Sequence, residues 1–356
     1  MIEHDPHPAD AATHSKPLVG ISMGDPCGIG GEVIVKALAD PDIRNLGRFV
    51  IYGTEEVLAG VADAAAIRPY WFRLSPGEDV TIGSGVVVVD FAEYAAGFWV
   101  HAHATAEGGK ASLRFFEAAI DAAKTHTLGA IVTAPINKKS WKLAGCRFPG
   151  HTEKLADALG VKRFTMAFVG GGLCVALASA HLGLFELRSR FTLGMVFQSI
   201  EQLHHALTQW FGHQRPKIAV AGLNPHAGED GQFGDEERRV IEPAIEMARN
   251  QGITVEGPLP ADTLFTPRVR MKYDGIVAMY HDQGLIPIKM LAFDTAVNVT
   301  LGLPVIRTSP DHGTAFDIAG TNQADSGSMK EAIRLACRLA SRTCPPATPS
   351  ITLHDQ

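Results

Sequence analysis

The sequence predicts an α/β fold built around a largely parallel β-sheet. Short apolar segments rich in Val, Ile and Ala alternate with longer amphipathic stretches along the chain. Most of the apolar segments are bounded by Gly, Pro or Asp, which is typical of strands buried on both faces. Alternation of strand and helix favours crossover connections and hence a parallel sheet. A length of 356 residues corresponds to about two domains or one large unit.

Eight segments have the composition and length of strands, and five longer segments between them have helical periodicity. The predicted strands are residues 18–23, 49–52, 86–90, 130–133, 165–169, 174–179, 217–222 and 275–280. The predicted helices are residues 32–38, 111–124, 198–210, 236–250 and 330–340. Glycines at positions 170–172 separate two of the strands and predict one hairpin within the sheet.

The charge and composition argue against several classes of protein. The chain carries 32 Lys and Arg against 38 Asp and Glu, a net charge of −6, and has no Lys/Arg block. A nucleic-acid or anionic-membrane surface built on positive charge is therefore not expected. Nowhere do about 18 apolar residues follow one another, as a membrane span requires, and residues 1–17 lack the apolar core of a signal peptide. The five cysteines include no CxxC pair, so we expect reduced thiols in a cytoplasmic protein.

Three histidines share one context, because each stands at or just past the end of a predicted strand. They are His181, His226 and His281. Ligands of α/β sheets bind outside the carboxyl ends of the strands, so three imidazoles converging there could form an open metal site. The alternative is three unrelated histidines that cap strands, since their spacing matches no local zinc signature. His101 and His103 could be rival ligands, but their Ala/Gly-rich surroundings favour a surface loop.

A second group of side chains suits a phosphorylated or carboxylated substrate. At Gly150 the sequence indicates a helix start, where backbone N–H groups and the helix dipole favour an anion. An ammonium, an amide and a guanidinium follow within a short stretch after His281, and together they could clamp a phosphate. Taken singly, each is more often a surface residue. The candidate substrate residues are His151, Thr152, Lys289, Asn298 and Arg307.

The loop from Gly24 to Glu32 follows a strand and opens a helix, as nucleotide-binding loops do. It does not satisfy GxGxxG, and no convincing ribose-binding acid lies about 20 residues further on. A conventional Rossmann site is therefore disfavoured, and a tight turn lining a cleft is the better interpretation. Two acids, Asp262 and Asp282, could orient a ligand imidazole or act as the catalytic base, and could equally be turn or cap residues.

Nine motifs occur in order between about residues 18 and 340. They are GDPCGIG at 24–30, TAPINK at 133–138, FPGHTE at 148–153, GLNPHAGE at 222–229, GPLPADTLF at 257–265, AMYHDQG at 278–284, VNVTLGLP at 297–304, IRTS at 306–309 and DHGTAFDIAG at 311–320. Their combination resembles the 4-hydroxythreonine-4-phosphate dehydrogenase family of vitamin B6 biosynthesis. The sequence departs from that family at Gly31, where proline is usual, and at Pro310.

The resemblance implies two α/β/α lobes with a cleft between them, similar to isocitrate and isopropylmalate dehydrogenases, in a homodimer whose active site lies near the dimer interface. The implied first lobe, on the cofactor side, comprises residues 18–138 and 305–344. The second lobe, on the metal and substrate side, comprises residues 139–304. Residues 1–17 and 345–356 are expected to be loosely ordered extensions.

The resemblance also assigns roles to residues. A divalent metal, commonly zinc, with magnesium or cobalt as alternatives, is held by residues matching His181, His226 and His281. The substrate residues match His151, Thr152, Lys289, Asn298 and Arg307. The adenosine of NAD or NADP is received by a segment that matches His312, Gly313, Thr314, Ala315 and Asp317. Asp262 and Asp282 remain the candidates for the base.

The implied reaction is oxidation of 4-hydroxy-L-threonine 4-phosphate to a β-keto acid, which decarboxylates to 3-amino-2-oxopropyl phosphate during pyridoxal phosphate biosynthesis. A metal on the substrate hydroxyl would lower its pKa and favour hydride departure to the nicotinamide. Within the same family, D-threonate or D-erythronate 4-phosphate dehydrogenases and cis-dihydrodiol dehydrogenases are alternatives. A metal-dependent hydrolase or aldolase acting on a phosphorylated sugar acid is the alternative from another class, and it would need no nicotinamide.

Overall fold

The computed structural model describes residues 16–78, 82–94 and 102–343, and it confirms the α/β class. Within these residues twelve strands form one continuous sheet in the order β3-β4-β2-β1-β5-β12-β11-β6-β7-β10-β8-β9. The strands are β1 Leu18–Ser22, β2 Arg48–Gly53, β3 Trp71–Leu74, β4 Gly85–Asp90, β5 Ala130–Thr133, β6 Thr165–Gly170, β7 Leu173–Leu177, β8 Lys217–Ala221, β9 Thr254–Leu259, β10 Gly275–Ala278, β11 Val297–Leu301 and β12 Ile306–Pro310. Residues 1–15 of the predicted N-terminal extension, the predicted tail 345–356 and His101 lie outside the described residues.

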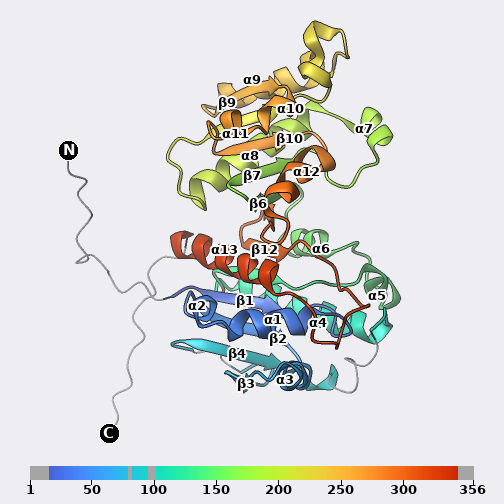
Figure 1. Cartoon of the computed structure of the whole chain (residues 1–356), viewed down its shortest axis with the longest axis vertical. Coiled ribbons are helices and arrows are strands. Elements are labelled where there is room, and N and C mark those ends of the chain that lie inside the picture. The colour runs from blue at the N-terminus through green and yellow to red at the C-terminus, as the bar shows by residue number, and fades with distance from the viewer. Residues whose placement is uncertain (1–15, 79–81, 95–101, 344–356) are drawn as a thin grey trace, which may run out of the picture.

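The sheet has two parallel halves joined by antiparallel strands. In the first half, β3, β4, β2, β1, β5 and β12 all run parallel. In the second half, β7, β10, β8 and β9 run parallel. Strand β11 pairs antiparallel with both β12 and β6, and β6 forms the predicted hairpin with β7 across Gly170–Leu173. We call β11 and β6 the junction; Figure 1 shows the two halves stacked along the long axis of the molecule with this junction between them.

Helices cover the sheet in both halves (Figure 1). The longer helices are α1 Gly30–Ala39, α3 Glu55–Ala64, α4 Ala106–Lys124, α6 His151–Ala158, α8 Leu193–Gln209, α9 Glu242–Asn250, α12 His281–Ala292 and α13 Gly327–Thr343. The shorter helices are α2 Pro41–Arg44, α5 Lys138–Leu143, α7 Leu184–Arg190, α10 Ala261–Leu264 and α11 Pro267–Arg270. Helix α13 comes last in the chain and returns to the first half, where it packs on β12, β5 and α1.

Capping residues start the helices near the junction. The Thr105 hydroxyl accepts a hydrogen bond from the backbone N–H of Gly108 at 2.9 Å and begins α4. The Asn137 side chain accepts from the backbone N–H groups of Lys139 and Ser140 at 2.9 and 3.0 Å and begins α5. Such caps satisfy donors that the first helical turn leaves free. The Asn137 cap fixes the backbone shortly after β5, which enters the site described below.

All eight predicted strands and all five predicted helices are present, but several elements were not predicted. The missed strands are β3, β9, β11 and β12. Strands β3 and β9 lie at the two sheet edges and are partly exposed, and β11 and β12 carry polar residues in place of an apolar run. No helix in the described part of the chain is long and apolar enough to cross a membrane.

Candidate active site

A cavity of about 330 Å³ lies where β5, β11 and β12 meet the start of α6. It collects side chains and backbone from both halves of the sheet. The sequence-predicted site residues that line it are His151, Thr152, His181, Asn298, Arg307, His312 and Gly313. Further lining residues include Thr133, Lys138, Glu153, Met166 and Asp311. The structure thus brings together residues that lie more than 150 positions apart in the sequence.

Arg307 on β12 is the most deeply buried charged group of the cavity, with 4% of its surface exposed. Its Nη2 and Nε donate to Thr133 Oγ1 at 2.6 and 3.1 Å, and its Nη1 donates to Thr300 Oγ1 at 3.4 Å. Burial lowers the pKa of the guanidinium to about 10, so it stays charged at neutral pH. Among the described residues no carboxylate lies within ion-pair distance of it. Glu153, which lines the same cavity, offsets the effect of burial on this pKa only in part. A buried charge without a carboxylate at ion-pair distance is unfavourable, so the cavity is suited to an anion.

His151 is the first residue of α6 and adds a second polar group to the same cavity. Its ring packs edge-on against Phe116 and Trp141, with centroids 4.6 and 5.4 Å away. Burial, and then the charge of Arg307, holds the pKa of His151 well below its ordinary value, so the imidazole is neutral. Its Nε2 and the Oδ1 atom of Asn298 are buried without a hydrogen-bond partner in the chain. Unpaired buried polar atoms are costly, which indicates that a polar ligand completes this wall.

Of the three proposed metal ligands, two lie close together. The rings of His181 and His281 have centroids 6.2 Å apart. Burial, together with the positive charge of Lys138 and then His281, lowers the pKa of His181 and favours the neutral imidazole that metals bind. His281 Nδ1 lies 2.7 Å from Asp282 Oδ1, a contact that fixes the ring and leaves Nε2 free.

His226 is arranged differently. It lies in an irregular helical turn after β8 with a left-handed φ of 53°, and its Nδ1 lies 3.0 Å from Glu229 Oε2. Its ring packs edge-on against Phe233, with the ring centroids 5.8 Å apart. In the part of the chain that the structure describes, no three His, Cys, Asp or Glu side chains are grouped so that they could hold a metal ion.

Three further candidates lie outside the cavity wall. Lys289 on α12 pairs with Asp311 Oδ2 at 2.9 Å and is about two-fifths exposed, so it sits at the rim. Asp262 accepts a hydrogen bond from the backbone N–H of Thr263 at 2.8 Å in an exposed turn, and it does not line the cavity. Asp282 touches His281 and does not line the cavity either. His103, the rival ligand within the described residues, is likewise absent from the cavity wall.

The structure adds site residues to which sequence reasoning gave no role. Thr133 orients the Arg307 guanidinium, and Lys138, Glu153 and Asp311 line the cavity. All four stand in motifs that the sequence displays, namely TAPINK, FPGHTE and DHGTAFDIAG. The motifs therefore marked these residues in the sequence. The contact of Thr133 with Arg307, 174 residues further along the chain, could be found only from the fold.

The segment proposed to receive the cofactor borders this cavity. His312 and Gly313 line it, and the backbone N–H of Ile29 donates to the carbonyl of Thr314 at 3.0 Å. A Cβ at Gly28 would lie 2.8 Å from atoms of Thr314, so this close approach requires glycine. His312 Nε2 is buried without a partner in the chain, and the space above Gly313 is open. The segment therefore has room and an unpaired polar atom for a bound nucleotide.

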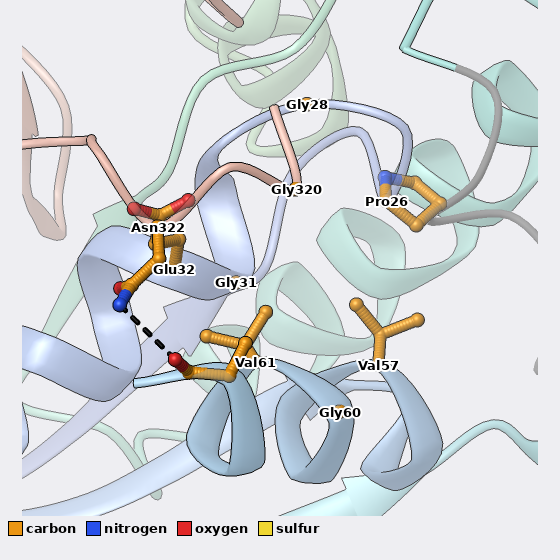
Figure 2. A pocket seen from close by; sticks show the side chains of 10 residues that line it. Pro26, Gly28, Gly31, Glu32, Val57, Gly60, Val61, Gly320 and Asn322 are labelled. Atoms are coloured by element: carbon orange, nitrogen blue, oxygen red, sulfur yellow. Dashed lines mark hydrogen bonds between the residues drawn. The ribbon is translucent and has the colours of Figure 1, made fainter. Parts of the chain in front are cut away.

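A smaller pocket of about 80 Å³ lies against the loop of residues 24–32, which leads into α1. Figure 2 shows it between the start of α1, helix α3 and residues Gly320 and Asn322. Next to it, burial raises the pKa of the Cys27 thiol to about 11. Cys27 is therefore a protonated thiol at neutral pH and is not suited to act as a nucleophile.

Comparison with known proteins identifies close relatives. Residues 46–336 match the family model described as pyridoxal phosphate biosynthetic protein PdxA. A 4-hydroxythreonine-4-phosphate dehydrogenase of Desulforapulum autotrophicum is 43% identical over 332 residues, which is 93% of this chain and 98% of that protein. A D-threonate 4-phosphate dehydrogenase of Cupriavidus necator is also 43% identical, over 92% of this chain and 98% of that protein. The crystal structure of a 4-hydroxythreonine-4-phosphate dehydrogenase from Klebsiella pneumoniae superposes with a TM-score of 0.84 at 37% identity, covering 93% of this chain and 100% of that one.

Proposed function

Because this chain belongs to the PdxA family of dehydrogenases, we propose that it oxidises 4-hydroxy-L-threonine 4-phosphate with NAD or NADP as hydride acceptor. The product is a β-keto acid that loses CO₂ to give 3-amino-2-oxopropyl phosphate, a step of pyridoxal phosphate biosynthesis. The observation that carries the proposal is the buried guanidinium of Arg307, which has no carboxylate partner in the described chain and faces a cavity with unpaired polar atoms.

In this proposal Arg307 binds the substrate phosphate. Its guanidinium is already oriented by Thr133 and Thr300 and presents a fixed set of donors. His151 and Thr152 at the start of α6 add the helix N-terminus and a neutral imidazole, both of which suit a phosphate oxygen. Asn298 completes the cavity wall from β11, and Lys289 at the rim is the fifth proposed contact. Such positioning lowers the barrier mainly by orienting the reacting carbon.

The remaining parts of the site are proposed as follows. The nicotinamide nucleotide, when bound, accepts the hydride; His312, Gly313, Thr314, Ala315 and Asp317 are the residues we propose to contact it. His181 and His281 are proposed to bind a divalent metal, with zinc preferred over magnesium or cobalt. That ion would supply Lewis-acid stabilisation of the substrate oxygen. His226 as third ligand stays a prediction, since its ring contacts Glu229 in the single chain. Asp262 and Asp282 stay candidates for the base.

We also propose a homodimer whose interface lies near this site. Helix α12 begins with His281, and the helix and the residue that follows it carry four large apolar side chains that are exposed in the single chain. They are Ile286, Met290, Leu291 and Phe293, exposed by 57, 81, 46 and 71%. Exposed apolar surface of this kind marks protein contacts. The strand order supports the proposed division into lobes 18–138 plus 305–344 and 139–304, because their strands occupy opposite ends of the sheet.

A second substrate in the same chemical class has specific support. The D-threonate 4-phosphate dehydrogenase is as identical to this chain as the first relative named above. D-threonate or D-erythronate 4-phosphate would use the same phosphate residues and the same hydride transfer. A terephthalate-type cis-dihydrodiol would bring a carboxylate and no phosphate to Arg307, so it would use fewer of the donors at Arg307 and the start of α6, and hydrolysis would leave the proposed nucleotide segment unused. We therefore rank both below the phosphorylated hydroxy acids.

The experiment is NADH or NADPH formation by the purified protein with 4-hydroxy-L-threonine 4-phosphate and, in parallel, with D-threonate 4-phosphate, each with and without a chelator. Chelator-sensitive turnover of the first substrate supports the proposal as stated. Preference for the second keeps the site chemistry and changes the substrate. Absence of reduced nucleotide with either substrate, in metal-supplemented protein, would contradict the proposed function.

A further inference from the structure

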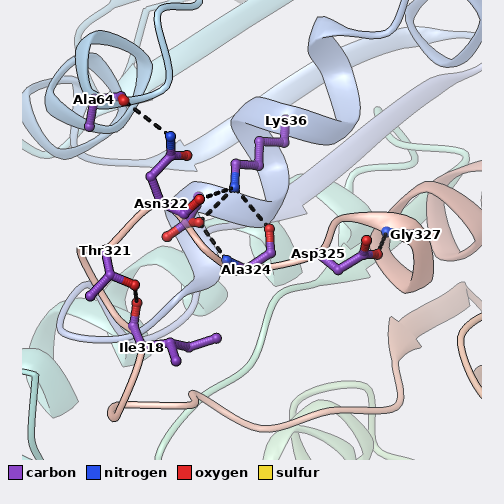
Figure 3. Close-up of polar contacts among 9 residues, drawn as sticks. Lys36, Ala64, Ile318, Thr321, Asn322, Ala324, Asp325 and Gly327 are labelled. Carbon is purple, nitrogen blue, oxygen red and sulfur yellow. Dashed lines mark hydrogen bonds and ion pairs between the residues drawn. The ribbon is translucent and has the colours of Figure 1, made fainter.

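The segment between β12 and α13, residues 311–326, contains no helix or strand, yet it carries the proposed nucleotide residues. Irregular backbone of this length needs tertiary contacts to hold one conformation. In its first part the carbonyl of Thr314 accepts a hydrogen bond from the backbone N–H of Ile29, as described above. Its second part is tied down by a different set of contacts, which Figure 3 shows around Lys36.

The side chain of Lys36 is the centre of these contacts. Its Nζ donates to the carbonyl oxygens of Asn322 and Ala324 at 3.0 and 2.9 Å, and to Glu32 Oε1 at 2.8 Å. An ammonium has three donors, so every one of them is used. The same Glu32 oxygen accepts the backbone N–H of Ala324 at 2.7 Å. Two residues one turn apart on α1 therefore hold the backbone of the segment through both its N–H and its carbonyl groups.

This arrangement differs from an ordinary surface ion pair. The side chain of Glu32 is 4% exposed and that of Lys36 is 21% exposed, so water competes weakly for either group. Charge-assisted hydrogen bonds in such surroundings are stronger than exposed pairs, which often contribute little. A further tie runs from Asn322 Nδ2 to the carbonyl of Ala64 at 3.1 Å, at the end of α3. Helix α1 and its start thus contact the segment at two places, Thr314 and residues 322–324.

We infer that Glu32 and Lys36 are positioning residues for the nicotinamide nucleotide. They fix residues 322–324 on α1, and this anchor holds His312 and Gly313 at the wall of the cavity. Neither residue lines that cavity, so neither contacts the substrate or the reacting atoms. The inference rests on the proposed function, because it takes residues 312–317 as the nucleotide segment.

The test is direct nucleotide binding, measured by fluorescence titration of NADH and NADPH without turnover. Lys36→Met removes all three hydrogen bonds, and we expect the dissociation constant of the preferred nucleotide to rise about tenfold. Lys36→Arg keeps the charge and several donors and should recover part of the affinity. Lys217→Met is the matched control, because Lys217 pairs with Glu256 at 2.7 Å on β8 and β9, at the far end of the sheet. We expect the control to change the dissociation constant less than twofold.

Steady-state kinetics separate positioning from general loss of structure. Lys36→Met should raise the KM for nucleotide about tenfold and leave kcat and the KM for the phosphorylated substrate within about twofold. Hydrogen exchange of the backbone amides of residues 318–326 should become faster in Lys36→Met and stay unchanged in Lys217→Met. If Lys36→Met fails to fold, Asn322→Gly removes only the tie to Ala64 and keeps the left-handed φ of 60° at that position. It should give the same pattern with a smaller amplitude.

The outcomes distinguish this inference from the proposed function. If the wild-type protein reduces nucleotide and Lys36→Met binds it as tightly as wild type, the inference is wrong and the proposed function stands. Equal losses in Lys36→Met and Lys217→Met would also overturn it, since the effect would then be unspecific. If the wild-type protein binds neither nucleotide, the proposed function fails first and the inference fails with it.

Discussion

The anion-binding wall and the histidine group of the same site are built in opposite ways. Arg307 and His151 lie on β12 and α6, are less than a tenth exposed, and are fixed by neighbouring side chains. His226 lies in an irregular turn after β8 and His281 is the first residue of α12, and their side chains are 64 and 42% exposed. The residues of the wall line one cavity, whereas no three metal-binding side chains are grouped in the described chain. The part proposed to recognise a charge is thus buried and held by its neighbours, and the part proposed to bind a metal is more exposed.

The largest expected effect comes from Arg307→Met. The variant removes the charge that the cavity offers to phosphate, so kcat/KM for the phosphorylated substrate should fall at least about 100-fold. The unfolding temperature without ligand should change little, because relief of a buried charge that has no carboxylate at ion-pair distance offsets the loss of three hydrogen bonds to Thr133 and Thr300. Kinetics and thermal unfolding measure both effects. A variant that retains wild-type kcat/KM would show that the phosphate binds elsewhere.

A smaller effect is expected from Asp282→Asn. The carboxylate contacts His281 Nδ1 at 2.7 Å, and loss of such a contact typically lowers metal affinity about 10- to 100-fold. The measurement is zinc or cobalt binding by titration against a chelator. Asp121→Asn is the control, since the Asp121 side chain is as exposed as that of Asp282, at 72%, and lies on α4. If Asp282→Asn and Asp121→Asn bind the metal equally tightly, the contact between Asp282 and His281 gives no support for a metal at His281.

The pH dependence of stability tests the buried wall directly. The pKa of His151 is lowered in the folded protein, so the unfolded chain binds a proton that the folded chain does not as the pH falls below about 6.5. The free energy of unfolding should therefore decrease by up to about 1.4 kcal/mol per pH unit below that value from this group. Urea unfolding at pH 7, 6 and 5 measures the slope. In His151→Gln the slope should be smaller, and an unchanged slope would assign it to other groups.

The smallest effect is expected at the rim. Lys289 pairs with Asp311, but its side chain is 41% exposed, so water screens the pair. Lys289→Met should change the free energy of unfolding by less than about 1 kcal/mol. Urea unfolding at neutral pH measures it. A larger change in the free energy of unfolding would show that the Lys289–Asp311 pair at the rim stabilises the fold as much as the contacts of the buried wall do. The contrast between the two parts of the site would then be smaller.

The sequence predicted the parts of the fold whose residues repeat a simple pattern. Strands such as β1 and β5 are nearly continuous apolar runs, and that pattern predicted both of them, although it did not predict the order of the strands. Strands β11 and β12 were missed because Asn298 and Arg307, which face the cavity, interrupt it. Polar residues that serve a site therefore conceal the strand that carries them.

The site was predicted unevenly for similar reasons. The residues of the anion wall lie in motifs, and the structure brings four of them, His151, Thr152, Asn298 and Arg307, into one cavity. The backbone of His226 could not be predicted, because its left-handed conformation and its contact with Glu229 depend on the turn after β8. The contact between Thr133 and Arg307 joins strands far apart in sequence, and only the sheet order reveals it.

The continuous sheet has a consequence for how a ligand reaches the cavity. Strand β11 pairs along its whole length with β6 on one side and over residues 297–299 with β12 on the other, so the ladder crosses from one half of the molecule to the other without a hinge loop. The halves cannot swing apart without breaking several backbone hydrogen bonds. Relative motion of the two halves is then confined to changes in the twist of the sheet. Such changes displace the strands little near the junction and more at the two edges of the sheet. Entry and exit of ligands must depend on loop and side-chain rearrangements around a frame of nearly constant width.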